Sequence, residues 1–162
     1  MKPEKAIRNG LLLDTNVLLV FVVAEVFGPA RVAQFKRTST YTVRDALILR
    51  AIVEQAPRLI TTLQTLSELS NLLFKSLDPR GASAADCKNL IQATHEIVVV
   101  KNDWLHIPDA FRIGVADIVI AEAARRTKGL LVTVDSQLYQ YALRNSIATQ
   151  NFMHFKINEH DA

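Results

Sequence analysis

The sequence predicts an α/β protein, a three-layer α/β/α sandwich with a central and mostly parallel sheet. Short apolar runs rich in leucine and valine alternate along the chain with longer segments of helical character. This alternation is typical of parallel sheets, whose strands are covered by helices on both faces and therefore appear as continuous apolar runs. The chain has 162 residues and shows no repeat, low-complexity segment or linker, so residues 1–162 are predicted to form a single domain.

Each predicted strand is a short apolar or β-branched run bounded by turn residues or by polar residues. The first is the leucine run that follows Gly10 and stops at Asp14, and a later one is the run of three valines that precedes Lys101. In chain order, the predicted strands are residues 10–13, 58–62, 97–101, 130–134 and, as an edge strand, 152–155.

The predicted helices are placed by their start and stop signals. Three of them open with a capping-box pattern, in which a hydroxyl residue is followed three positions later by an acid: Thr42 with Asp45, Thr65 with Glu68, and Ser83 with Asp86. Glycine or proline follows several of the helix ends. The predicted helices are residues 15–27, 42–56, 65–77, 83–95, 115–127 and 135–145, with a loop at 102–107 and a short helix after Pro108.

Composition limits the class of protein. The chain has 19 Lys and Arg residues against 16 Asp and Glu residues, a mild excess that permits a polyanionic partner without requiring one. Its single cysteine excludes an internal disulfide framework and is compatible with a reducing compartment. The apolar run after the N-terminal cations is interrupted by Asp14 and Asn16, and its unbroken part, 17–24, is too short for a membrane span. We therefore predict a cytoplasmic protein that does not associate with membranes.

Four carboxylates stand either at the ends of predicted strands or in the first turn of a predicted helix. They are Asp14, Glu68, Asp117 and Asp135. In an open α/β sheet these positions meet in the crevice beyond the carboxyl ends of the strands, which is where ligands bind. The sequence therefore predicts one acidic site built from distant parts of the chain.

Helix capping offers a simpler explanation for each acid taken singly. Asp14 and Asp135 are suitable N-caps, Glu68 is a suitable capping partner of Thr65, and an acid such as Asp117 is favoured in a first helical turn. The explanation weakens for the set as a whole, because Asp14 and Asp117 interrupt the most apolar runs of the chain. A buried, unpaired carboxylate is costly, so these residues require either a partner or a function.

A divalent cation supplies such a function. Carboxylates that converge repel one another, and a hard cation removes the repulsion. A cluster of acids without Cys or His at ligand spacing favours Mg²⁺ or Mn²⁺ over Zn²⁺. One or two such ions suit the hydrolysis of phosphodiester bonds. The sequence thus predicts that Asp14 is a metal ligand.

Four short motifs resemble those of PIN-domain nucleases and occur in the same order. They are Asp14-Thr15-Asn16, Leu66-Ser67-Glu68-Leu69, Ala116-Asp117-Ile118-Val119-Ile120-Ala121 and Val132-Thr133-Val134-Asp135. The resemblance extends over about residues 10–155. It implies a three-layer fold and the Mg²⁺- or Mn²⁺-dependent cleavage of single-stranded RNA, leaving a 5′-phosphate and a 3′-hydroxyl. It also implies a VapC-like bacterial toxin neutralised by a cognate antitoxin, since small members of the family often have that role.

The same resemblance implies roles for individual residues. The catalytic and metal-binding acids would be Asp14 and Asp117 as principal ligands, completed by Glu68 and Asp135. Asn16 and Thr133 would be supporting polar groups that orient a carboxylate or a water. One segment departs from the family, because residues 27–57 are longer than in its most compact toxins.

That longer segment carries two further predictions. Lys36 and Arg37 lie among hydroxyl and aromatic residues, a combination that suits contacts to single-stranded RNA but is more often a solvated connection between helices. The helix at 42–56 is apolar on more than one face, which predicts that it is buried and that part of it forms a homodimer or antitoxin interface.

Three alternatives remain at this point. A PIN nuclease that processes RNA without being a toxin would have the same acids. A non-catalytic PIN-like module would be expected to lose some of them, whereas this chain keeps all four. A phosphatase with an aspartyl nucleophile would carry a second Asp two positions after Asp14, where this chain has Asn16.

Overall fold

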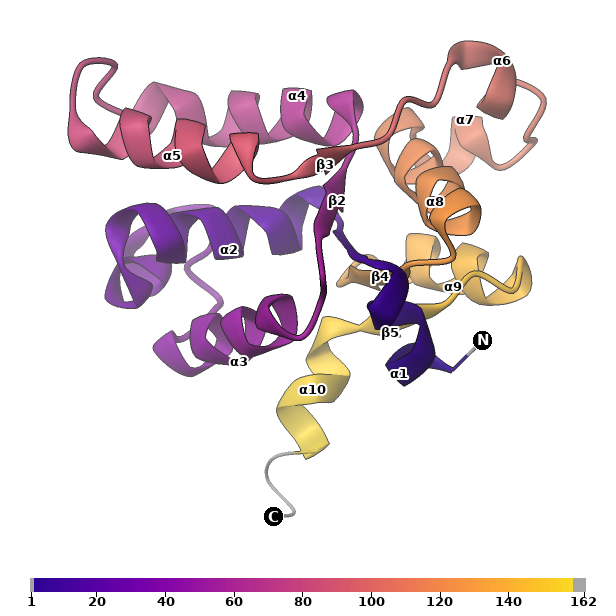
Figure 1. The fold of residues 1–162 in the computed structure, drawn as a ribbon, viewed down its shortest axis with the longest axis horizontal. Coiled ribbons are helices and arrows are strands. Elements are labelled where there is room, and N and C mark those ends of the chain that lie inside the picture. Colours follow the sequence, from indigo (N-terminus) through magenta and orange to yellow (C-terminus); the bar gives the residue numbers. More distant parts are fainter. Residues whose placement is uncertain (1, 159–162) are drawn as a thin grey trace.

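A computed structural model describes residues 2–158, and its centre is one five-stranded sheet (Figure 1). The strands are β1 (Leu11–Leu13), β2 (Leu59–Thr61), β3 (His95–Glu96), β4 (Leu130–Thr133) and β5 (Thr149–Asn151). Their spatial order is β3-β2-β1-β4-β5, and every neighbouring pair is parallel. The order changes direction between β1 and β4, which creates a crevice beyond their carboxyl ends.

Helices cover both faces of this sheet. The longer ones are α2 (Thr15–Phe27), α3 (Val43–Glu54), α4 (Leu63–Leu73), α5 (Ala82–Gln92), α8 (Val115–Thr127) and α9 (Ser136–Arg144). The short helices are α1 (Pro3–Ala6), η1 (Ile7–Asn9), η2 (Pro29–Gln34), η3 (Phe74–Ser76), α6 (Lys101–Trp104), α7 (Ala110–Ile113) and α10 (Phe152–Asn158). In Figure 1, α2 to α5 lie on the left of the strands and α6 to α9 on the right. The predicted three-layer α/β/α sandwich is therefore confirmed, with a sheet that is wholly parallel.

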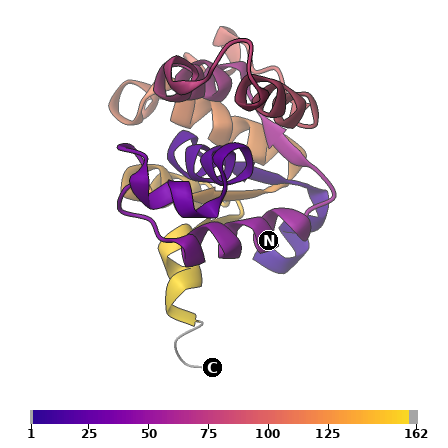
Figure 2. The same ribbon diagram turned by 90° about the vertical axis from the view of Figure 1, so that its left-hand side faces the viewer.

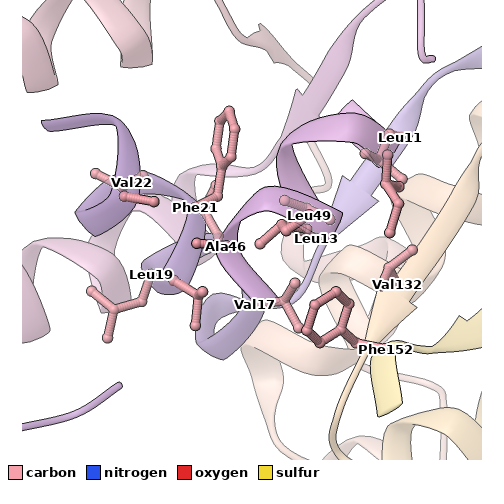
Figure 3. Close-up of a cluster of buried hydrophobic side chains, with 14 of the residues drawn as sticks. Leu11, Leu13, Val17, Leu19, Phe21, Val22, Ala46, Leu49, Val132 and Phe152 are labelled. Carbon is pink, nitrogen blue, oxygen red and sulfur yellow. The ribbon is translucent and has the colours of Figure 1, made fainter. Parts of the chain in front are cut away.

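The core consists of two apolar clusters, one on each face of the sheet. Successive residues of a strand point to opposite faces, so Leu11 and Leu13 join the cluster under α2 while Leu12 joins the cluster under α8. Figure 3 shows the first of these clusters, in which side chains of β1 and β4 meet those of α2, α3 and Phe152. Burial on both faces explains why β1 is leucine throughout, since each buried leucine stabilises the fold by about 1.5–3 kcal/mol.

Helix α2 is buried along most of its length, from Val17 to Ala24. It contacts α4 and α5 on one side and η2 and α3 on the other. Figure 2 shows this arrangement, viewed toward the C-terminal end of α2. The longer segment 27–57 therefore has a structural role, because η2 and α3 cover a side of α2 that would otherwise face water. The capping box that opens α3 is confirmed: the Thr42 amide donates to Asp45 Oδ2 at 2.8 Å, and the Asp45 amide donates to Thr42 Oγ1 at 3.2 Å.

The N-cap predicted for the helix at 65–77, Thr65, was wrong by three residues. Helix α4 begins at Leu63, and its N-cap is Thr62, whose hydroxyl accepts the Thr65 amide at 3.3 Å. Thr62 has the extended backbone that an N-cap requires and follows directly from β2. Glu68 consequently lies in the second turn and is not a capping partner of Thr65.

The capping box predicted for the next helix was also wrong. Helix α5 begins at Ala82 without a side-chain cap and ends at Gln92 instead of residue 95. The Ser83 hydroxyl accepts the Asp78 amide at 3.3 Å, so it serves the preceding turn.

The third strand is shorter and earlier than predicted. Only His95–Glu96 pairs with β2, and the valines at 98 and 100 are 70% and 55% exposed. A β-branched run forms a strand only where a neighbour offers hydrogen bonds, and β2 has ended at Thr61. Asp103 instead accepts the Val100 amide at 2.9 Å, and α6 takes up the last residue of the predicted strand and the first half of the predicted loop 102–107.

The predicted edge strand at 152–155 is a helix. The last strand is β5, and α10 begins directly after it, with Asn151 Oδ1 accepting the Met153 amide at 2.9 Å. Phe152 is fully buried and lies 6.2 Å from the ring of Tyr41, so its burial comes from packing on the α3 side of the core and not from sheet pairing. Among the described residues, no helix is long and apolar enough to cross a membrane.

Gly10 provides a test of how tightly the strands pack. Its φ of +134° is unfavourable for residues with side chains, and an added Cβ would overlap the Ile60 side chain. We expect Gly10→Ala to reduce the free energy of unfolding by about 2–4 kcal/mol, measured by urea denaturation. Gly28→Ala is the matched control, because Gly28 has a φ of +92° but nothing within 4 Å of an added Cβ. A loss for Gly10→Ala no larger than that for Gly28→Ala would contradict tight packing here.

Candidate active site

A pocket of about 320 Å³ opens in the crevice beyond the carboxyl ends of β1 and β4. Its lining residues come from the first turns of α2 and α8, from the start of α9 and from one face of α4. They are Asp14, Thr15, Asn16, Glu68, Asn71, Leu72, Asp117 and Asp135. The structure thus brings the four predicted acids together, although they are separated by up to 121 positions in the sequence.

Asp14 is the most buried of these acids, at 2% exposure. Its Oδ1 accepts the Val17 amide at 2.8 Å, which makes it the N-cap of α2, and its Oδ2 accepts the Val134 amide at 3.0 Å and the Thr133 hydroxyl. Burial raises the pKa of Asp14 above its ordinary value, while the hydrogen bonds oppose that rise. Asp14 therefore has both the predicted capping role and a fixed orientation toward the pocket.

Thr133 links Asp14 to Asp135. The Thr133 hydroxyl is fully buried; it donates to Asp14 Oδ2 and accepts the Asp135 amide at 2.9 Å. Asp135 is in turn the N-cap of α9, with Oδ1 accepting the Leu138 amide at 2.8 Å. Thr133 stands behind the pocket and orients a carboxylate, which agrees with the supporting role implied for it.

Glu68 is held by the first turn of α2. Its Oε2 accepts the Thr15 hydroxyl at 2.8 Å, which ties the middle of α4 to the start of α2. Asn16, beside Thr15, is exposed and lines the pocket. Glu68 keeps its Oε1 oxygen without a hydrogen bond from the described residues.

Asp117 differs from the other three acids because no described residue donates a hydrogen bond to it. It lies in the first turn of α8, three residues after Gly114, which is the N-cap of the helix and has a φ of +117°. Burial raises its pKa to about 7, with further contributions from the negative charges of Asp14, Asp135 and Glu68. A carboxylate with so high a pKa is characteristic of functional sites.

The negative charge of the pocket is not balanced by side chains. None of the lining residues in the described part of the chain is a lysine, arginine or histidine. The N-termini of α2, α8 and α9 supply partial positive charge, but a helix end is worth only about half an elementary charge. The pocket is therefore suited to a cation.

Oxygen donors of this kind fit Mg²⁺ or Mn²⁺. Asp117 has both oxygens free of described partners, and Glu68 and Asp135 each have one. Asp14 Oδ1 accepts one bond and keeps a lone pair, whereas its Oδ2 already accepts two. As the side chains stand, no described group of three or more His, Cys, Asp or Glu residues has the close arrangement of a complete metal site. The donor chemistry thus fits the ion, and the half-exposed acids are those with room to turn toward it.

Comparison with known proteins gives no match: no family model, curated protein or solved structure is significantly similar to the chain.

Lys36 and Arg37, which were predicted to contact RNA, do not line the pocket. Both are exposed in the turn after η2, and η2 begins at the end of α2 opposite to Asp14, about 20 Å away along a helix of 13 residues. The segment returns toward the site at Tyr41, whose pKa is raised to about 12 by burial and by the charges of Asp14 and Asp45.

The sequence interpretation missed three pocket residues. Thr15, Asn71 and Leu72 line the pocket beside the acids. Helical spacing would have identified two of them, because Asn71 and Leu72 are three and four positions after Glu68 and share its face of α4.

Proposed function

We propose that this chain is a Mg²⁺- or Mn²⁺-dependent endoribonuclease that hydrolyses phosphodiester bonds of single-stranded RNA, as a PIN-domain nuclease would. The observation that carries the proposal is the convergence of four carboxylates in one pocket whose lining has no side-chain cation. Structural capping requires neither that convergence nor the free carboxylate of Asp117. A divalent ion in such a pocket supplies a Lewis acid and a neutralising charge for a phosphodiester.

The chain's own residues then have distinct parts. Asp14 is fixed by Thr133 and by the Val17 and Val134 amides, so it presents a carboxylate of set orientation. Glu68 is positioned by Thr15 of α2. Asp117, whose pKa is about 7 with no cation bound, would hold the metal as the ionised carboxylate.

A second candidate is a non-catalytic RNA-binding module. It is favoured by one observation, that the acids as they stand do not form a complete metal site among the described residues. Such a module would bind RNA without cutting it, and its binding would not need a divalent ion.

The finer part of the proposal is biological. The resemblance to VapC-like proteins supports a cytoplasmic toxin neutralised by an antitoxin, while a PIN nuclease of RNA processing would use the same pocket. In α3, Ala46, Leu49 and Ile52 are buried as predicted, and Leu47 is exposed and available to a second copy or an antitoxin. Induced expression in bacteria distinguishes the two roles, since a toxin stops growth and its Asp14→Asn variant does not.

Asp135→Asn tests the nuclease proposal with little structural disturbance. Asparagine is as good an N-cap as aspartate, so α9 and the fold are expected to persist while one acid is lost. We expect wild-type protein to cut single-stranded RNA with Mn²⁺ and not with chelator, and Asp135→Asn to cut at least about 10-fold more slowly. Gel analysis of end-labelled RNA, single-stranded and double-stranded, measures both. Absence of Mn²⁺-dependent cleavage by pure, folded wild-type protein would favour the non-catalytic module.

A further inference from the structure

The pocket extends along one of its helices more than along the others. Helices α2, α8 and α9 each contribute to the lining only at or near their first turn, whereas α4 contributes Glu68, Asn71 and Leu72. These residues have the i, i+3, i+4 spacing of one helix face. Of the helices that line the pocket, α4 is therefore the one that continues from the acids along the surface that a long substrate would cross.

The next residue on this face is Lys75. It lies seven positions after Glu68 and about one turn, about 5 Å, beyond Asn71 and Leu72. The chain continues there as η3, and Lys75 keeps the i, i+3, i+4, i+7 spacing with Glu68, Asn71 and Leu72. Its neighbour Phe74 lines an apolar groove with Leu77 and residues of α5, so Lys75, one position further along the chain, faces a different direction.

Lys75 is also a cation with no ion-pair partner among the described residues. It is exposed to solvent. The other cations on the helices that line the pocket are less suitable: α2 has none, and Arg125 and Arg126 of α8 are both paired with Glu122. Arg144 is also exposed without an ion pair from the described residues, but it is the last residue of α9, nine positions from Asp135.

We propose that Lys75 binds a backbone phosphate of single-stranded RNA adjacent to the phosphate held at the acids, so that the RNA runs along the Glu68–Lys75 face of α4. A polyanion approaching four carboxylates is repelled except where cations meet its phosphates. Lys75 does not line the pocket, but it is an unpaired cation just beyond the α4 residues that do. Asn71, between the acids and Lys75, offers an amide to the sugar or phosphate of the intervening nucleotide. This inference rests on the proposed function in taking RNA as the ligand.

The test is the salt dependence of RNA binding. The probe is a fluorescein-labelled single-stranded RNA of mixed sequence, bound in Mg²⁺ to protein carrying Asp135→Asn so that cleavage is slow. Each phosphate contact to a single strand contributes about 0.7 to the slope of log affinity against log salt. We expect Lys75→Gln to lower that slope by about 0.7 and to weaken binding near 50 mM salt by roughly 5- to 10-fold.

Lys88→Gln is the matched control. It removes the same charge, but Lys88 lies on α5 beside the apolar groove. Equal slopes for Lys75→Gln and the parent protein, or equal losses for Lys75→Gln and Lys88→Gln, would overturn the inference. A Lys75-dependent slope in a protein that never cuts RNA would support the phosphate contact and contradict the nuclease. Normal cleavage by the wild-type protein, with KM unchanged by Lys75→Gln, would support the nuclease and contradict the phosphate contact.

Discussion

Asp14→Asn is expected to reduce Mn²⁺-dependent cleavage of single-stranded RNA by more than about 100-fold. Loss of a group that merely orients a metal ligand commonly costs about 10- to 100-fold, and Asp14 is the acid that three hydrogen bonds hold in place. Asparagine can still accept the Val17 amide, so the cap of α2 is retained. The amide nitrogen would replace the acceptor of the Val134 amide, and we expect the stability change to stay within about 2 kcal/mol. Turnover and circular dichroism of the same preparation measure both effects.

Asp45→Asn is the matched control for this experiment. Asp45 is also a buried carboxylate at the start of a helix, where it accepts the Thr42 amide, but it does not line the pocket. We expect Asp45→Asn to lose stability and to keep wild-type turnover. Folded Asp14→Asn protein with wild-type turnover would show that Asp14 is a cap and nothing more.

The position of the acids could be predicted because it depends on sheet topology. Asp14 and Asp135 follow apolar runs that had to be strands, and parallel strands end at the same edge of a sheet. Glu68 was assigned to the site even though the start of its helix was misplaced. A shift of three residues along α4 changes the turn in which Glu68 lies but not the crevice that the helix borders.

The errors concern features that depend on partners distant in sequence. The valines at 98 and 100 have the composition of a strand, but the length of β3 is set by where β2 ends. Residues 152–155 have the composition of an edge strand, but Phe152 packs in the core beside Tyr41, and that packing determines the structure of the segment. The bond from Thr15 to Glu68 joins residues 53 positions apart and could not be deduced from either local sequence.

The metal-free protein should lose stability as pH rises, and Asp117 should account for a measurable part of that loss. Its pKa of about 7 in the fold, against an ordinary value of 3.8, means that the native state holds this proton more tightly than the unfolded chain. The resulting stabilisation is fully present below the unfolded pKa and is lost as pH rises through about 7. Asp117→Asn resembles the neutral form at every pH. In chelator, we therefore expect the variant to melt above wild type at about pH 8 and the gap to narrow toward about pH 5.

Mn²⁺ should reverse the order of the two melting temperatures. An ion that binds only the native state at a hundredfold excess over its Kd adds about 2.7 kcal/mol, which for a chain of this size raises Tm by about 5–10 °C. We expect this rise for wild type near pH 8, where Asp117 is ionised, and a smaller rise near pH 5, where protons compete for the carboxylate. Asp117→Asn should respond less at either pH because it has lost an oxygen donor with a full charge. If Asp117 served only the helix dipole, the variant would instead lose about 0.3–1 kcal/mol in chelator, and Mn²⁺ would leave both melting temperatures unchanged. That pair of results would remove Asp117 from the proposed metal site, because neither the repulsion among the acids nor its relief by a cation would then exist.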